Sequence, residues 1–154
     1  MAHTLSQIFA GREPLVVGVL KGAFLFVADL VRAMEIPVRI DFVQAASYGS
    51  ATTSSGQVRL VKDCTADISG QDIILVDTVV DTGLTLDFLH TQLRRRQPRS
   101  LTTCVLLDKP HRRQVEVHID HVGFPPTEGF VVGYGLDFDD AYRHLDGLYL
   151  LDEV

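Results

Sequence analysis

Short apolar runs that alternate with helical patterns constrain this fold more than any other feature. Residues 15–20 read LVVGVL and residues 73–76 read IILV, with no polar side chain to face water. A strand is apolar at every position only where both faces of its sheet are covered, which is typical of parallel sheets. Residues 23–34 and 84–96 have apolar residues at helical spacing. The chain therefore predicts an α/β fold, with a parallel β-sheet flanked by helices.

The remaining apolar runs extend this pattern over the whole chain. Leu86, Leu89 and Leu93 share one face of the predicted helix at 84–96. A length of 154 residues suits one domain with a real core, and no repeat or linker divides the chain. We predict a single domain over residues 1–154. Further strands are predicted at 38–45, 58–61, 101–107, 115–119, 130–132 and 148–151.

Composition excludes several classes of protein. A net charge of −6 argues against a nucleic-acid partner, and the basic run at 94–99 ends a predicted helix, where it complements the helix dipole. No apolar run is long enough to cross a membrane and the start does not resemble a signal peptide, so we expect a cytoplasmic protein without a membrane partner. Cys64 and Cys104 are expected to be reduced, and His90 and His144 to lie on the surface.

Residues 47–57 read SYGSATTSSGQ and differ from the rest of the chain. They join two predicted strands, and a hairpin needs far fewer turn residues. Composition supports two interpretations equally, a long surface loop and a lid over a site.

Residues 73–85, IILVDTVVDTGLT, place two carboxylates beyond a predicted strand and directly before a helix. Ligands of open parallel sheets bind at this position, and the amides of a helix start hold phosphate. Neither a nucleoside-triphosphate P-loop nor a dinucleotide glycine motif is present. Because carboxylates repel phosphate, Asp77 and Asp81 suit sugar hydroxyls, Mg²⁺ or a proton on the substrate. Alternatively, Asp81 caps the helix and Asp77 ends the strand.

This stretch resembles the phosphoribosyl-pyrophosphate signature of purine phosphoribosyltransferases, and the chain as a whole is similar to the hypoxanthine-guanine phosphoribosyltransferases. Five segments in the family's order, from about Leu15 to the C-terminus, support the resemblance. The other four are Leu20-Lys21-Gly22, Ser47-Tyr48-Gly49 with Ser54-Ser55-Gly56, Leu107-Asp108-Lys109-Pro110, and FVVGYGLD at 130–137 followed by Tyr142-Arg143.

The resemblance implies a type I phosphoribosyltransferase fold. Its core would span about 15–120, a small hood would comprise about 1–14 and 121–154, and a flexible lid would lie at 47–57. The implied reaction transfers the 5-phosphoribosyl group from phosphoribosyl pyrophosphate to a 6-oxopurine, with Mg²⁺ as cofactor. It yields IMP or GMP and pyrophosphate in purine salvage. Family members are commonly homodimers or homotetramers, and we expect the same here.

The resemblance also assigns roles on the phosphoribosyl side of the site. Asp81 would take or share the ring proton of the purine, and the Leu20–Lys21 peptide would be cis. The implied contacts are Asp81, Thr82, Gly83, Leu84 and Thr85 for the 5′-phosphate, Asp77 and Thr78 for the ribose, Leu20, Lys21, Gly22 and Arg143 for the pyrophosphate, and Ser47, Tyr48 and Gly49 for the lid. Lys21 and Gly22 would meet the pyrophosphate through backbone groups, and Arg143 would be its cationic contact.

On the base side, Lys109 would donate to the 6-oxo group and thereby reject adenine, because two facing donors would be left unpaired. Phe130 would stack on the ring and Val131 would read its edge through backbone groups. Asp137 would lie near the base and near a second metal ion, and Asp77 would be the other metal ligand.

Two departures from the family pattern leave alternatives open. The family usually has Glu-Asp where this chain has Asp77-Thr78, and its N-terminal region is usually longer. Thr78 carries no charge, so we expect weaker binding of metal and ribose. The alternatives are a weak or inactive regulatory protein that binds nucleotide or phosphoribosyl pyrophosphate, and a xanthine-preferring relative.

Overall fold

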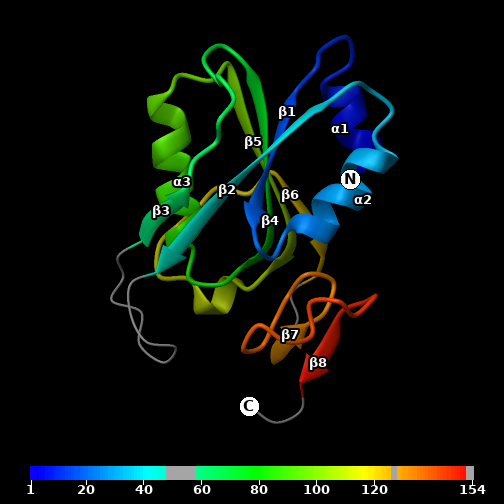
Figure 1. Cartoon of the computed structure of the whole chain (residues 1–154), viewed down its shortest axis with the longest axis vertical. Helices are drawn as coiled ribbons and strands as arrows, with labels where there is room; N and C mark the ends of the chain where they lie inside the picture. The colour runs from blue at the N-terminus through cyan, green and yellow to red at the C-terminus, as the bar shows by residue number, and fades with distance from the viewer. Residues whose placement is uncertain (48–57, 126–127, 152–154) are drawn as a thin grey trace.

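The computed structural model describes residues 1–47, 58–125 and 128–151. In these residues a six-stranded sheet forms the centre of a three-layer fold, with strand order β3-β2-β1-β4-β5-β6 (Figure 1). A two-stranded sheet of β7 and β8 lies apart from it. The main-sheet strands are β1 (Leu15–Leu20), β2 (Arg39–Ser47), β3 (Val58–Lys62), β4 (Asp72–Val80), β5 (Ser100–Asp108) and β6 (His121–Phe124). The others are α1 (Ala2–Ile8), α2 (Phe24–Ala33), α3 (Leu84–Arg95), the 3-10 turn η1 (Pro110–Arg112), β7 (Phe130–Val132) and β8 (Tyr149–Leu151).

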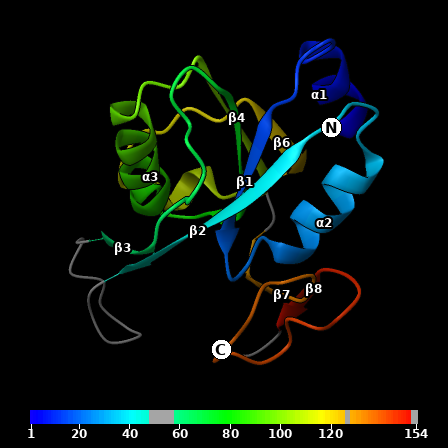
Figure 2. The same ribbon diagram turned by 45° about the horizontal axis from the view of Figure 1, so that its top comes forward.

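The predicted parallel sheet is confirmed, with helices on both faces. β1 pairs in parallel with β2 and β4, β5 continues the parallel order, and β3 pairs antiparallel to β2. α3 covers one face, while α1 and α2 cover the other (Figure 2). Leu86, Leu89 and Leu93 are buried between α3 and the sheet, as the helical spacing predicted. No helix in the described ranges is both long enough and apolar enough to cross a membrane.

The order of the strands creates a switch point between β1 and β4. β2 and β3 lie to one side of β1, whereas β4, β5 and β6 lie to the other side. The loops that follow β1 and β4 therefore leave their strands in opposite directions, and a crevice opens between them. The β7–β8 sheet lies beyond the carboxyl ends of these strands (Figure 1).

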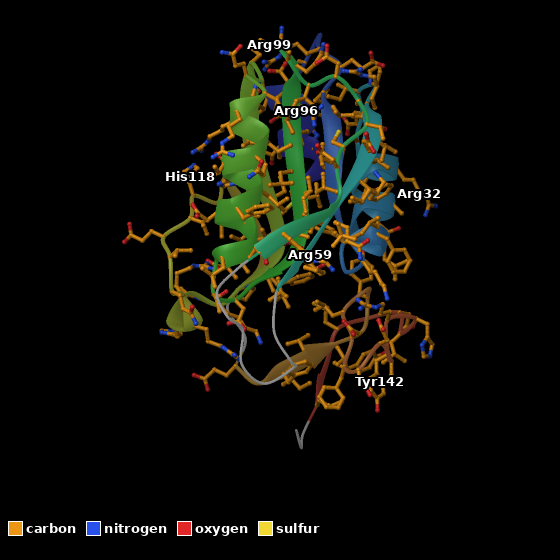
Figure 3. The ribbon with its side chains drawn as sticks, turned by 60° about the vertical axis from the view of Figure 1, so that its left-hand side comes forward. Arg32, Arg59, Arg96, Arg99, His118 and Tyr142 are labelled. Atoms are coloured by element: carbon orange, nitrogen blue, oxygen red, sulfur yellow. The ribbon has the colours of Figure 1, made fainter. Side chains whose placement is uncertain are left out.

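The opposite end of the sheet is held by a buried carboxylate. Asp72, at the start of β4, is 1% exposed and accepts hydrogen bonds from Arg99 Nε at 3.0 Å and from Ser100 Oγ at 2.6 Å. Arg12 Nη1 lies 3.3 Å from Asp72 Oδ2. Figure 3 shows Arg99 at the end of the molecule away from Tyr142. The Arg99 guanidinium, the largest influence, lowers the pKa of Asp72, so this end contributes stability above the ordinary carboxyl pKa.

Two expectations about residues 115–124 are wrong in detail. Residues 115–119 alternate like a strand but pair with no strand in the described chain; Val117 and Ile119 instead pack over the α3 side of the core. Asp120 N–H donates to Thr103 O at 3.0 Å, and pairing with β5 begins at His121. Residues 121–124 therefore belong to the main sheet, where we had expected the hood to begin. α1 likewise packs in the core beside α2.

His90 was expected on the surface and is buried. It lies on the sheet-facing side of α3, 6% exposed, and its Nε2 is 2.7 Å from Thr103 Oγ1. Burial, followed by the nearby Arg94, lowers its pKa. His90 is thus a neutral core residue, and the hydroxyl of Thr103 satisfies it.

Candidate active site

A cavity of about 240 Å³ opens at the switch point. Its walls come from the end of β1, from the end of β4 and from the first turn of α3. Its lining residues are Val19, Leu20, Ala45, Asp77, Val79, Val80, Asp81, Thr82, Gly83, Thr85 and Leu86. Both acids of the stretch at 73–85 therefore line one cavity.

The turn from β4 into α3 presents backbone amides to a ligand. Gly83 precedes the helix with φ +85°, and a Cβ there would lie 2.7 Å from Val115 O, so only glycine fits. Thr82 O accepts from Gln114 N at 2.9 Å and from Val115 N at 3.2 Å. The Thr82 carbonyl is thus engaged by residues 114–115, while the first amides of α3 lack acceptors within the helix. Such a helix start favours a phosphate group.

Asp81 has a buried carboxylate oxygen without a hydrogen bond. Its Oδ1 lies 2.8 Å from Arg112 Nε, but the two groups are not aligned as donor and acceptor, and Oδ1 is otherwise unpartnered among the described residues. A buried acceptor without a donor is costly. The atom is therefore available to accept a proton from a bound ligand.

Asp77 and Thr78 lie where β4 reaches the cavity. Burial raises the pKa of Asp77 to about 6, although its Oδ1 accepts a hydrogen bond from Thr78 N at 2.7 Å. Thr78 is 1% exposed, and its hydroxyl faces the loop after β1, because a Cβ on Gly22 would lie 2.6 Å from Thr78 Oγ1. The two neighbours thus differ: Asp77 faces the cavity and Thr78 supports the adjacent loop.

The loop after β1 lies against the segment that follows β7. The Leu20–Lys21 peptide is cis. A Cβ on Gly135 would overlap the carbonyl oxygen of Gly22, so these two backbones are in direct contact. Lys21 Nζ forms an ion pair with Asp140 Oδ1 at 3.0 Å. Residues more than a hundred positions apart in the sequence therefore form one side of the site.

Arg143 is held beside this loop by several acceptors. Its Nη1 donates to Gly135 O at 2.8 Å, and its Nη2 lies 2.7 Å from Asp137 Oδ1 and 3.2 Å from Asp140 Oδ1. Its Nε is buried without a hydrogen bond in the described chain. The guanidinium is fixed in place and keeps one unused donor.

Lys109, directly after β5, links the end of that strand to the residue that precedes β7. Its Nζ donates to Gly129 O at 2.7 Å, and its backbone N–H donates to Val80 O at 2.9 Å. Phe130, which follows Gly129, is partly exposed. Its ring meets that of Phe138 edge to face, with ring centroids 5.5 Å apart, while Val131 is buried. A flat apolar ligand with a polar edge suits an exposed ring beside a lysine.

Sequence comparison identifies the family. Residues 1–139 match the phosphoribosyl transferase domain family. The hypoxanthine-guanine phosphoribosyltransferase of Aquifex aeolicus (strain VF5) is 44% identical over 154 residues, which cover 99% of this chain and 86% of that protein. The Mycobacterium avium hypoxanthine-guanine phosphoribosyltransferase is 50% identical over 142 residues, which cover 92% and 70%. This chain belongs to the hypoxanthine-guanine phosphoribosyltransferase family.

Solved structures of this family confirm the expected fold. A hypoxanthine-guanine phosphoribosyltransferase from Bacillus anthracis str. 'Ames Ancestor' superposes with a TM-score of 0.90 at 42% identity, covering 96% of this chain and 87% of the other. A hypoxanthine phosphoribosyltransferase from Staphylococcus aureus gives 0.90 at 35% identity, covering 96% and 80%. The type I phosphoribosyltransferase fold and the expected enzyme class are both confirmed.

Most residues assigned by the family resemblance come together at one end of the sheet. The expected cis peptide is present at Leu20–Lys21. Ser47 ends β2, but Tyr48, Gly49 and the rest of the expected lid lie outside the described residues. The individual roles of the site residues stay predictions.

Sequence reasoning missed Arg113 and Asp140. Arg113 forms an ion pair with Asp108, and its Nη1 donates to Asp81 O at 3.0 Å, so it links the Lys109 segment to the turn between β4 and α3. Nothing in the sequence distinguishes it from the adjacent Arg112. Asp140 contacts two cations that the resemblance did assign to the site, and only the folded chain brings the three together.

Proposed function

We propose that this protein transfers the 5-phosphoribosyl group from phosphoribosyl pyrophosphate to hypoxanthine, guanine or both, with Mg²⁺, and releases pyrophosphate. The products are IMP or GMP. The observation that supports this most directly is the switch-point cavity, where the amides at the start of α3 adjoin two carboxylates. This arrangement provides one place for a sugar phosphate and one for its hydroxyls.

The phosphoribosyl group would bind along the turn from Asp81 to Thr85. The amides of the turn would hold the 5′-phosphate, and Asp77 would accept from the ribose hydroxyls. The pyrophosphate would lie against Lys21, Gly22 and Arg143, where the unused Nε of Arg143 supplies a donor. Holding both reactants in line and stabilising the leaving diphosphate would account for most of the rate.

The base would bind between the hood and the ends of β4 and β5. Phe130 would stack on the purine and Lys109 would donate to its 6-oxo group. Asp81 Oδ1, which is paired with Arg112 but accepts no hydrogen bond in the described chain, would accept the proton that leaves the imidazole nitrogen when the glycosidic bond forms. The choice among hypoxanthine, guanine and xanthine depends on backbone groups near Val131 and Asp137.

The residues present fit a Mg²⁺ ion that arrives with the diphosphate. Only Oδ1 of Asp77 accepts a hydrogen bond from the described chain, which leaves Oδ2 as a hard oxygen ligand beside the cavity. Asp137 already forms an ion pair with Arg143 and accepts a hydrogen bond from Asp140 N, so Asp77 is the better-supported ligand. When bound, Mg²⁺ would neutralise charge on the leaving diphosphate.

A product assay tests this function. The protein is incubated with phosphoribosyl pyrophosphate, MgCl₂ and, in turn, hypoxanthine, guanine, xanthine or adenine, and nucleotides are separated by chromatography. We expect IMP or GMP, and no AMP. If a relative such as the Aquifex aeolicus protein works in parallel and this protein forms no nucleotide with any base, the proposal is refuted.

We also propose a homodimer or homotetramer in a reducing compartment such as the cytoplasm. An apolar cavity of about 660 Å³ beside α2, together with the exposed Phe124 next to it, supports association. The free, buried Cys64 and Cys104 support the compartment. Light scattering after size-exclusion chromatography tests the oligomeric state.

A further inference from the structure

One carboxylate oxygen contacts two cations from distant parts of the chain. Asp140 Oδ1 lies 3.0 Å from Lys21 Nζ and 3.2 Å from Arg143 Nη2. Lys21 follows β1 and Arg143 follows β7. In the proposed function Lys21 would meet the pyrophosphate through its backbone, which places its ammonium beside that group, and Arg143 would meet it through its guanidinium. The oxygen thus occupies a position between two cations that a phosphate oxygen would also favour.

Asp140 is not needed to hold Arg143 in place. Without Asp140, Arg143 would keep its hydrogen bond to Gly135 O and its ion pair with Asp137 Oδ1. By contrast, Asp140 is the acidic partner that the described chain offers to Lys21. The side chain of Asp140 is 70% exposed, so water and ligands can reach the pair. Such a contact is easily displaced.

The backbone around Asp140 is shaped to present this side chain. Asp139, Asp140 and Tyr142 have φ values of 51°, 58° and 71°, which non-glycine residues rarely adopt. Asp137 Oδ2 accepts from Asp140 N at 2.9 Å and closes the turn. An exposed aspartate beside two cations is charged at neutral pH.

We propose that Asp140 is an internal counter-anion that occupies the cations of the pyrophosphate subsite and is displaced when a diphosphate binds. This inference rests on the proposed function, in which Lys21 and Arg143 bind that group. Binding of diphosphate then requires the loss of two ion pairs. Asp140 therefore weakens the affinity for pyrophosphate and favours its release as a product.

The chain offers a matched control for testing this role. Asp139 is the exposed neighbour, it has a similar φ, and no ion pair to it is found in the described residues. Asp139→Asn and Asp140→Asn remove the same charge from adjacent positions, and asparagine tolerates both φ values. Binding of inorganic pyrophosphate with MgCl₂ is measured by calorimetry for both variants and for the unchanged protein. Ribose 5-phosphate serves as a probe of the turn from Asp81 to Thr85 alone, where the proposed function places the 5′-phosphate.

We expect Asp140→Asn to bind pyrophosphate about three- to tenfold more tightly than Asp139→Asn, while ribose 5-phosphate binding stays within about twofold. Asp140→Gly, which also suits the positive φ, is expected to shift the affinity in the same direction if the asparagine variant folds poorly. Equal affinities in the two asparagine variants, weaker binding in Asp140→Asn, or an equal gain for ribose 5-phosphate would each overturn the inference.

Nucleotide formation by the same preparations separates this inference from the proposed function. If the unchanged protein forms nucleotide while Asp140→Asn and Asp139→Asn bind pyrophosphate equally, only the role of Asp140 is refuted. If no nucleotide forms and neither the unchanged protein nor the variants bind pyrophosphate, both are refuted.

Discussion

Replacing Gly83 by alanine tests whether the turn from β4 into α3 requires glycine for two separate reasons. The φ of +85° strains any other L-residue, and the added Cβ would lie 2.7 Å from Val115 O. The neighbouring atom is backbone, and it belongs to a segment tied to Thr82 O. The carbonyl of Val115 therefore cannot rotate away as a flexible side chain would.

The structure supplies a control that separates the two costs. Gly70 also has a positive φ, +66°, but a Cβ there meets nothing within 4 Å. Gly70→Ala therefore costs only the backbone strain, roughly 1–2 kcal/mol. Gly83→Ala adds the overlap with Val115, for a total of roughly 2–5 kcal/mol. For a chain of this size each kcal/mol lowers Tm by about 2–4 °C.

Thermal unfolding of both variants, together with KM for phosphoribosyl pyrophosphate, checks this reasoning. We expect Gly83→Ala to lower Tm clearly more than Gly70→Ala and also to raise KM, because the amides of the turn move. Gly70→Ala is expected to leave KM unchanged, since it lies away from the site. Equal losses of Tm in the two variants would refute the argument that contact with Val115 makes glycine necessary.

Three further predictions concern the charges of the site. Lys109→Met is expected to lower kcat/KM for hypoxanthine by about 10²-fold or more, because the 6-oxo group loses its donor; steady-state kinetics checks this. For Asp77, whose pKa of about 6 exceeds the ordinary 3.8, folding favours the protonated form, so the contribution of Asp77 to stability is greatest below pH 4 and is lost as pH rises through 6. In urea unfolding without Mg²⁺, Asp77→Asn is expected to avoid this loss of up to about 3 kcal/mol, less where water reaches the carboxylate. Thr78→Asp, compared with Thr78→Val, is expected to lower the Mg²⁺ concentration that gives half-maximal rate; an unchanged Mg²⁺ dependence would show that the missing acid is not a defect.

The parts of the fold that sequence predicts well are those in which burial alone determines the pattern. β1 begins and ends at the predicted residues, because a strand covered on both faces has no polar position. α3 begins at the predicted Leu84, where a glycine with positive φ ends the preceding turn. The turn at 81–85 could be located because a glycine stands directly before the helical pattern; that the turn binds phosphate stays a prediction.

The parts that sequence does not predict depend on contacts between distant residues. Residues 115–119 have the alternation of a strand, yet they cover α3, because Asp120 sets the register at which pairing with β5 begins. His90 lies four residues after Leu86 and three before Leu93, so helical spacing places it on the buried face, while its polar side chain argues for the surface. The hydroxyl of Thr103 makes it acceptable in the core. Asp140 and Lys21 meet only after the segment that follows β7 has packed against the loop after β1.

The double attachment of Arg113 has a consequence for the spacing of the two substrates. The guanidinium of Arg113 forms an ion pair with Asp108, next to the segment that would face the purine. It also donates a hydrogen bond to the carbonyl of Asp81, in the turn that would face the sugar phosphate. This side chain thereby reinforces the separation of the two halves of the site, which the β4–β5 pairing and the hydrogen bond from Lys109 N to Val80 O also set. A compound that joins a purine mimic to a phosphate would have to match that span, and a shorter cation at position 113 would alter the span itself.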